Sequence, residues 1–216
     1  MEGSWYKTNG LNPNYDLFDC QTNVFKPSST NANELDMDIF FRVSRPESSG
    51  GGYWENALTE HMVLDTYPSI AQENVDDIIR PTGRTMHTEG KMYGLKFSEN
   101  WFIIGESDGK GDVPPFKLVA YRGHTLQGNY EGAFVYAKEP VLPVAAIPAI
   151  TEAAAKAGLD FNQFTRIDNA CPTNKKALND ASAGTGTSST DWINLIIGEG
   201  GVIDWISPGW RGEYKS

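Results

Sequence analysis

The chain has 216 residues, of which 39% are hydrophobic and 12% aromatic, and its formal net charge is −10. This hydrophobic content is sufficient for a packed core and excludes a chain that is disordered throughout. The acidic balance excludes a nucleic-acid-binding protein and simple electrostatic docking on anionic lipid, because no basic stripe is present.

Alternating hydrophobicity is the dominant pattern from residue 3 to residue 137. Apolar side chains recur at every second position of 35–43, which predicts a half-buried strand with a polar outer face. Comparable strands are predicted at 16–26, 59–65, 84–88, 91–97, 100–106, 116–121 and 132–137. About eight antiparallel strands separated by glycine- and proline-rich turns predict a closed up-and-down barrel or a sandwich.

One helix follows these strands. Pro148 suits the first turn of a helix, 149–157 is rich in strong helix formers, and Gly158 is well placed as the C-terminal stop. A short strand is predicted around 161–167. Eight strands, a helix and a return strand occur in this order in lipocalins. We therefore expect a mainly β, lipocalin-like eight-stranded barrel with one C-terminal helix and an extended C-terminal arm.

The composition changes after the predicted barrel domain, 1–176. Residues 177–190 are rich in serine, glycine, threonine and alanine, which predicts a flexible linker. The last segment, 191–216, contains Trp192, Trp205 and Trp210. Because clustered tryptophans favour interfaces and the membrane–water boundary, this segment is predicted to dock on a membrane protein or antenna complex. The alternative is an arm folded back over its own barrel.

Cys20 and Cys171 are the two cysteines of the chain. In a reducing cytosol they would be unrelated thiols, whereas in an oxidising compartment they would form one bridge that closes nearly the whole barrel. A loop of this length is worth roughly 4–5 kcal/mol in the chain-entropy model. The first residues lack the apolar core of a signal peptide, so either the chain is trimmed or a targeting segment has been removed.

Several motifs in a fixed order carry a resemblance to a known family. Gly3-Ser4-Trp5 matches the Gly-x-Trp signature of lipocalins, whose tryptophan typically lies at the closed end of the barrel beneath an arginine, here Arg122 or Arg166. The longer matching runs are 5–21, 121–123, 132–136, 141–143, 160–161 and 166–171. Together they resemble the lipocalin domain of the violaxanthin de-epoxidase family, closest to its de-epoxidase-like and de-epoxidase-related branches.

The resemblance implies a plastid protein of the thylakoid lumen that acts on epoxy-xanthophylls. Members of the family bind the long polyene in the barrel, and de-epoxidases reduce the epoxide with ascorbate at acid pH. A Cys20–Cys171 disulfide is also implied. The expected partners are a xanthophyll or other carotenoid and, through the C-terminal arm, the thylakoid membrane or photosystem and antenna proteins. Ascorbate is expected only if reductive activity is retained, and no metal is expected.

The chain departs from the de-epoxidases in the loop before the last barrel strand. The family carries a catalytic aspartate there, in a Trp-Asp-Gly-Tyr-Gly-Gly-like run. In this chain the aspartate falls on Gly128 or Asn129, whereas the tyrosine is kept as Tyr130. Another family aspartate falls on Glu47. The cysteine-rich and glutamate-rich regions that flank the barrel in the de-epoxidases have no counterpart in these residues, and together these departures argue against ordinary reductive de-epoxidation.

Opening or rearranging an epoxide requires a proton donor whose pKa lies near the ambient pH. Glu47, Glu131 and Tyr130 are the candidate donors near the predicted barrel mouth, and His124 opens the loop that holds Tyr130. A carboxylic acid beside an apolar cavity has a raised pKa. Alternatively, the two glutamates are solvated loop charges. No cysteine–histidine cluster has the spacing of a zinc site.

Aromatic residues are the candidate walls of a cavity for an extended polyene, because pockets in barrels are mostly apolar. They are Tyr53, Trp54, Tyr93, Trp101, Phe102 and Phe134, with Gln127 as a further ligand contact. Alternatively, these side chains fill the core and leave no cavity.

The leading interpretation is a lipocalin of the thylakoid lumen that binds a xanthophyll and de-epoxidises or rearranges it. The rival is a non-catalytic subunit docked on the lumenal side of a photosystem or light-harvesting antenna complex, which the tryptophans of the arm and the replaced aspartate favour. A plain carotenoid carrier is the third interpretation.

Overall fold

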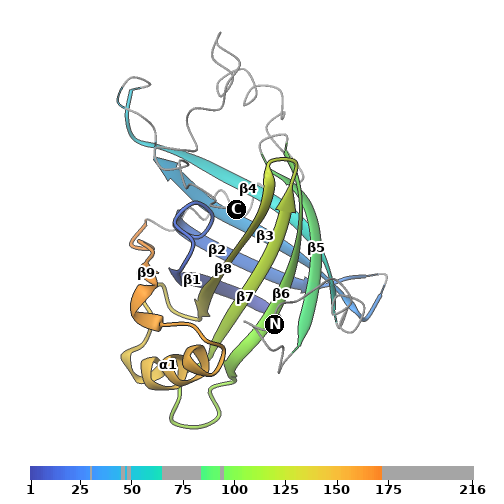
Figure 1. The fold of residues 1–216 in the computed structure, drawn as a ribbon. Helices are drawn as coiled ribbons and strands as arrows, with labels where there is room; N and C mark the ends of the chain where they lie inside the picture. The colour runs from blue at the N-terminus through green and yellow to red at the C-terminus, as the bar shows by residue number, and fades with distance from the viewer. Residues whose placement is uncertain (30, 45–46, 48–49, 65–83, 93–94, 172–216) are drawn as a thin grey trace, which may run out of the picture. The chain divides into compact units, whose positions relative to one another are not determined.

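The computed structural model describes residues 1–29, 31–44, 47, 50–64, 84–92 and 95–171 (Figure 1). The strands are β1 (Gly3–Gly10), β2 (Asp19–Pro27), β3 (Glu34–Ser44), β4 (Tyr53–Leu64), β5 (Thr85–Met92), β6 (Leu95–Ser107), β7 (Phe116–Thr125), β8 (Gly128–Ala137) and β9 (Thr165–Arg166). The helical segments are η3 (Val144–Ala146), α1 (Ile147–Lys156) and η4 (Phe161–Gln163). The predicted linker and the docking arm with Trp192, Trp205 and Trp210 lie outside the described residues.

Strands β1 to β8 close into an antiparallel barrel. Each strand pairs with the next one along the chain, and β1 pairs with both β2 and β8. Closure leaves no free edge between the first and last strands of the ring. The ninth strand, β9, adds outside the ring to β1. The predicted mainly β, eight-stranded up-and-down barrel with one C-terminal helix is confirmed, and the sandwich is excluded.

Two strand predictions differ from the structure. The first strand, β1, is not among the predicted strands, because a lysine interrupts its apolar alternation: Lys7 points into the barrel and is as buried as Trp5. The strand predicted at 91–97 is not separate. It covers the end of β5 and the start of β6, and β6 continues through the strand predicted at 100–106. The ring therefore keeps eight strands, with one gained at the N-terminus and one lost by merging.

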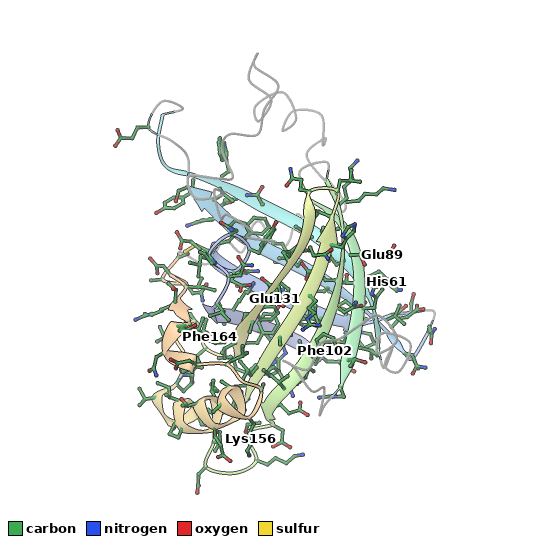
Figure 2. All side chains as sticks on the ribbon, viewed as in Figure 1. His61, Glu89, Phe102, Glu131, Lys156 and Phe164 are labelled. Atoms are coloured by element: carbon green, nitrogen blue, oxygen red, sulfur yellow. A yellow bond between two sulfur atoms is a disulfide. The ribbon has the colours of Figure 1, made fainter. Side chains whose placement is uncertain are left out.

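The wall formed by β6, β7 and β8 is apolar on both faces. Its outer face packs against α1, where Leu118, Ala120 and Val135 meet Ile150. For this reason β7 is buried at most positions instead of at alternate ones. Phe102 belongs to this outer layer, as does Phe164 (Figure 2). The prediction that Phe102 lines the interior is therefore wrong.

The helix α1 begins and ends where its residues predict. Pro148 lies in the first turn, and Gly158, just beyond the helix, has a left-handed φ of 77°. A close approach to the sheet occurs at Gly105, where a Cβ atom would lie 2.6 Å from that of Ala153. Within the described part of the chain, no helix combines the length and apolar character that crossing a membrane requires.

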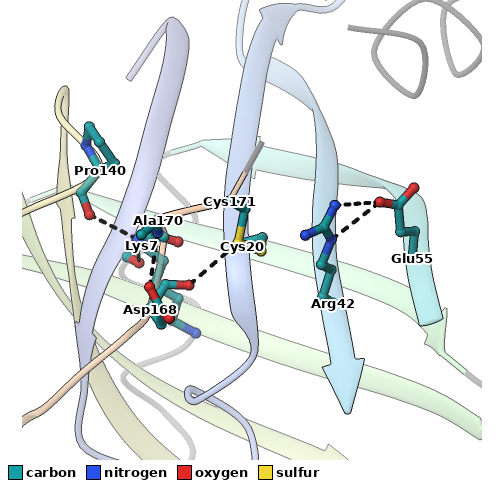
Figure 3. The surroundings of a disulfide bond; sticks show 9 residues. Lys7, Cys20, Arg42, Glu55, Pro140, Asp168, Ala170 and Cys171 are labelled. Atoms are coloured by element: carbon teal, nitrogen blue, oxygen red, sulfur yellow. Dashed lines mark hydrogen bonds and ion pairs between the residues drawn. A yellow bond between two sulfur atoms is a disulfide. The ribbon is translucent and has the colours of Figure 1, made fainter. Parts of the chain in front are cut away.

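A disulfide joins Cys20, at the start of β2, to Cys171, with 5.8 Å between their Cα atoms (Figure 3). The same segment is hydrogen-bonded along the barrel: the Cys20 amide donates to the carbonyl of Asp168 at 2.8 Å, and the Asn169 side chain donates to the carbonyl of Lys7 at 2.8 Å. The bridge implied by the resemblance is thus confirmed, and it fixes the end of the described chain to β1 and β2.

Candidate functional site

One end of the barrel interior is filled with large apolar and aromatic side chains. This floor consists of Trp5, Phe25, Met37, Met62, Met86, Ile103 and Tyr136, all of them buried. They come from the N-terminal halves of β1, β3 and β5 and from the C-terminal halves of β2, β4, β6 and β8. Because neighbouring strands are antiparallel, these halves lie at the same end of the ring. The floor leaves the opposite end, where β3 joins β4 and β7 joins β8, as the mouth.

A lysine covers the floor tryptophan. The ammonium of Lys138 lies 3.7 Å from the centroid of the Trp5 ring, at the distance of a cation–π contact. Arg122 instead forms an ion pair with Glu131 on the outer wall, with 3.6 Å between the charged atoms. Arg166 lies on β9, outside the ring, where its register partner is Asn9 of β1. The prediction that an arginine covers this tryptophan is therefore wrong, although a cation does take that place.

Above the floor, a carboxyl and a phenol are joined inside the barrel. The Tyr130 hydroxyl donates to Oε1 of Glu99 at 2.6 Å, and the indole N–H of Trp101 donates to Oε2 at 2.7 Å. Burial raises the pKa of Glu99, against the effect of both hydrogen bonds. Burial and the neighbouring Glu99 raise the pKa of Tyr130. The pair can therefore hold and deliver protons in a partly buried setting.

A second carboxyl, that of Glu60, lies at about the same depth in the barrel as Glu99. Its side chain accepts a hydrogen bond from the Thr88 hydroxyl at 3.0 Å, and the residue is 6% exposed. Burial, with a further contribution from Glu99, raises the pKa of Glu60 to about 8, whereas the Thr88 hydrogen bond and Lys7 oppose the rise. Glu60 is therefore protonated at neutral pH.

The raised pKa of Glu60 predicts that the barrel is less stable at alkaline pH. In the unfolded chain the carboxyl ionises near 4.5, but in the barrel it keeps its proton to about 8. Unfolding between these values releases a proton, so the free energy of unfolding should fall as pH rises through this window. Urea unfolding across the window should show this slope, and E60Q should reduce it. An E60Q slope equal to that of the unmodified chain would contradict the assignment.

A buried ion pair fixes the connection between β1 and β2 inside the barrel. The ammonium of Lys7 lies 2.7 Å from Oδ1 of Asp16, and their side chains are 6% and 0% exposed. The Asp16 carboxylate also accepts hydrogen bonds from the Asn12 amide at 2.8 Å and from the Tyr121 hydroxyl at 3.2 Å. The lysine and two hydrogen-bond donors thus satisfy one buried carboxylate, as a buried charge requires.

The same connection places Tyr15 against the acid–phenol pair. The rings of Tyr15 and Tyr130 stack with centroids 4.3 Å apart and planes inclined by 19°. Tyr121 approaches the other side of Tyr130 in an edge arrangement, with centroids 6.1 Å apart. The Tyr130 hydroxyl is therefore aimed at Glu99 by two neighbouring rings as well as by its hydrogen bond.

Glycines in the wall make room for the two phenol rings. A Cβ atom at Gly123 would lie 2.2 Å from the ring of Tyr130, and one at Gly132 would lie 2.4 Å from the hydroxyl of Tyr121. In each case the ring lies flat over the backbone of the strand beside it instead of projecting across the interior. The glycines thus allow the two phenol rings to pack closely against the neighbouring strand.

Adding a methyl group at Gly123 should displace the Tyr130 ring and cost about 1–3 kcal/mol in the free energy of unfolding, as overpacked sites do. G111A is the matched control, because a Cβ atom there meets nothing within 4 Å. Urea unfolding of both variants measures the difference. Equal stabilities of G123A and G111A would show that the Tyr130 ring adjusts without cost.

A family model for the VDE lipocalin domain matches residues 1–169. The chain belongs to the violaxanthin de-epoxidase (VDE) lipocalin family. It is 30% identical over 173 residues to the chloroplastic violaxanthin de-epoxidase of Nicotiana tabacum, covering 79% of this chain and 31% of that protein. The Arabidopsis thaliana protein of the same name is also 30% identical, with 79% and 33% covered. The chain thus spans about a third of the length of these relatives.

Among solved structures, lobster apocrustacyanin A1 is 12% identical to this chain, with a TM-score of 0.48 and with 77% of this chain and 76% of that chain covered. The site in this VDE-family chain is defined by features of its own geometry. They are the floor, the carboxyls Glu60 and Glu99, the three tyrosines and the Lys7–Asp16 pair.

Three of the predicted ligand contacts share the interior of this VDE-family barrel. The rings of Trp101 and Phe134 meet edge to face with centroids 5.0 Å apart. Trp54 lies nearer the mouth, half-buried, on the inward-facing side of β4 that also carries Glu60. Gln127 is exposed in the β7–β8 turn, and Tyr93 lies outside the described residues. Tyr53, also predicted to line the interior, is 55% exposed on the opposite face of β4 from Trp54.

At the rim, a groove of about 520 Å³ lies on the outer side of the β5–β6 and β7–β8 hairpins, where Lys91, Lys96 and His124 line it together with Phe97, Thr125 and Leu126. Leu126, at the tip of the β7–β8 hairpin, is 88% exposed. Half-buried Leu58 and Val43 contribute apolar surface on the opposite side of the mouth. The rim of the barrel thus combines apolar and charged side chains.

Of the predicted catalytic residues, Tyr130 is the one whose ring lies in the interior. His124 is exposed on the outer side of β7, where its Nδ1 lies 2.8 Å from Oδ1 of Asn129. Glu131 lies on the outer wall (Figure 2), and Glu47 is exposed in the β3–β4 connection. The structure therefore does not bring Tyr130, Glu47 and His124 together.

Sequence reasoning missed Glu60 and Glu99. The signal that could have found them is strand phase, because side chains two residues apart face the same side of a strand. Glu60 shares its phase with Met62, and Glu99 shares its phase with Trp101 and Ile103. The side chains of Met62, Trp101 and Ile103 are all buried. A carboxylate in the apolar phase of a strand is the mark of a functional interior position.

Proposed function

We propose that this VDE-family lipocalin takes an oxygenated end of a carotenoid into the open half of its barrel and opens an epoxide there by proton transfer. The observation that carries the proposal is the Glu99–Tyr130 pair, hydrogen-bonded at 2.6 Å among interior aromatic rings. Apolar walls suit the polyene, and the polar cluster above the floor suits an oxygen atom at its end. The relatives named violaxanthin de-epoxidase support a xanthophyll epoxide as the ligand.

Two reactions begin with protonation of the epoxide oxygen. In a rearrangement, the C–O bond breaks to a hydroxyl and a carbon-bound proton is lost, which forms a C=C bond with no net redox change. In de-epoxidation, the oxygen leaves as water and two electrons come from an external reductant such as ascorbate. Groups of this chain serve the first route without a reductant, because carboxyls and phenols can both give and take protons.

We also propose a plastid location, in an oxidising and acidic compartment such as the thylakoid lumen. Its support is the chloroplastic naming of the relatives, together with a disulfide of the kind that persists in oxidising compartments. The raised pKa of Glu60 keeps this carboxyl protonated in an acidic compartment. Fractionation of plastids that express the tagged chain tests this, and recovery outside the thylakoid fraction would contradict it.

Incubation of the purified chain with violaxanthin in lipid micelles, with and without ascorbate, tests the reaction by pigment chromatography. We expect pigment to bind and to be converted, and conversion without ascorbate identifies the rearrangement. E99Q should lower the rate by about 100-fold, the scale of a lost proton-transfer group, whereas E131Q on the outer wall should not. Pigment that binds but stays unchanged in every condition would contradict catalysis and favour a carotenoid carrier. Absence of binding would overturn the proposal.

A further inference from the structure

We propose that Glu60 and Glu99 form a two-carboxyl site in which Glu60 gives the proton that opens the epoxide and Glu99 takes the proton that the ligand loses. This inference rests on the proposed function and names the acid and the base of that reaction. It assigns a role to Glu60, a buried carboxyl that the Glu99–Tyr130 pair leaves unexplained.

Strand register places the two carboxyls on one ring around the interior. Thr88, which donates to Glu60, is the register partner of Glu99, and Glu99 in turn pairs with Gly123, the partner of Tyr130. One strand, β5, separates β4 from β6, so the backbones that carry the carboxyls lie about 10 Å apart, or two strand spacings. Glu99 contributes to the raised pKa of Glu60, so the two carboxyls face the same part of the interior.

The two carboxyls differ in the hydrogen bonds they accept, and this difference decides which one keeps a proton. Glu99 accepts from the Tyr130 hydroxyl and from the Trp101 indole, one donor on each oxygen. Glu60, within the part of the chain that the structure describes, accepts from Thr88 alone, on Oε2. Donors stabilise the ionised form of a carboxyl. Glu99 is therefore the carboxylate of the pair, and Glu60 keeps its proton on the oxygen that Thr88 does not occupy.

The charged and titratable groups around Glu60 preserve this assignment. Lys7 of β1 faces both carboxyls and lowers the pKa of each, so it does not reverse their order. Tyr130 and Tyr136 of β8 face Glu60, and both phenols have raised pKa values and stay neutral. Asp16, paired with Lys7, raises the pKa of Glu99, but by less than the hydrogen bonds from Tyr130 and Trp101 lower it. Two carboxyls in unequal settings are the usual arrangement of an acid and a base in one site.

The step balances without a reductant. The Glu60 proton goes to the epoxide oxygen, the C–O bond breaks, and its electron pair stays on the oxygen as a hydroxyl group. Glu99 removes a proton from the carbon next to the resulting cationic centre, and the C–H electrons form a C=C bond. Glu60 has lost one proton and Glu99 has gained one, so transfer from Glu99 to Glu60 through water restores the site.

The rate of violaxanthin conversion without ascorbate tests the assignment, with the full chain and the variants E60Q and E89Q. The amide that E60Q introduces is neutral, as the protonated carboxyl is, and can still accept from Thr88. We therefore expect E60Q to fold and bind pigment but to convert it at least about 100-fold more slowly. The rate for the unmodified chain should fall when Glu60 ionises at high pH. Glu89 is a control carboxyl on β5 with a side chain that is 78% exposed, and E89Q should keep the full rate.

Infrared spectroscopy gives a second measurement that does not depend on turnover. At neutral pH we expect the carbonyl stretch of a buried protonated carboxyl, which E60Q removes and E99Q keeps. A band that E99Q removes instead, or an E60Q rate equal to that of the unmodified chain, would overturn the inference while the proposed function stands. If the unmodified chain converts no pigment, the proposed catalysis and the use of Glu60 in it both fall.

Discussion

Loss of the Cys20–Cys171 disulfide is expected to lower the free energy of unfolding by about 5 kcal/mol. The bridge spans 151 positions of the sequence, and a cross-link that closes so long a loop removes much of the entropy of the unfolded chain. An effect of this size is comparable to the whole stability of many domains. Urea unfolding followed by tryptophan fluorescence, with and without a thiol reductant, measures it.

The C20S/C171S double variant separates loss of the cross-link from other effects of the reductant. Cys20 has a left-handed φ of 58°, so glycine at this position would relieve backbone strain and obscure the result, whereas serine keeps the strain. The reductant should not change the midpoint of the double variant further. If the oxidised chain and the double variant unfold at the same urea concentration, the bridge does not hold the barrel together.

Replacing Lys7 with methionine is expected to cost about 3–5 kcal/mol, because it leaves the carboxylate of Asp16 buried without its cation. Both side chains are almost fully enclosed, at 6% and 0% exposed. The loss should also free the β1–β2 connection that carries Tyr15, so the midpoint of urea unfolding should fall together with pigment conversion.

K156M is the matched control for K7M. Lys156 pairs with Glu152 at 2.6 Å, but both side chains are largely exposed, at 74% and 68%. Surface pairs of this kind are worth about 0.5 kcal/mol or less. In the double variant K7M/D16N no unpaired charge is left, so it should regain part of the loss. Equal costs for K7M and K156M would show that the interior pair is solvated.

The barrel could be predicted from sequence because most of its strands expose one face to water. In 35–43 the inward positions are apolar and the outward ones mostly polar, so the period of two is visible in the residues. The same reasoning fails at β1, where Lys7 points inward to meet Asp16, a partner that the sequence pattern does not reveal. It also fails at 91–97, which covers the end of β5 and the start of β6 and is not one strand.

The site is harder to predict than the fold, because its carboxyls violate the rule that charged strand residues face water. The strand predicted at 100–106 begins one residue after Glu99, so the prediction assigns that carboxyl to neither face. Proximity in sequence to Tyr130 favours His124 and Glu131 as its catalytic neighbours. In an antiparallel pair, however, alternate residues face opposite sides, which puts those two outside the barrel.

The close packing of Tyr130 and Tyr121 over two glycines restricts which substitutions this family can accept. The ring of Tyr130 lies against Gly123, and that of Tyr121 against Gly132, so neither glycine can gain a side chain while the ring keeps its position. A lineage that acquires a side chain at either glycine must shrink the aromatic residue on the neighbouring strand. A homologue that has lost the Tyr130 phenol in this way would carry substitutions at both positions of the pair.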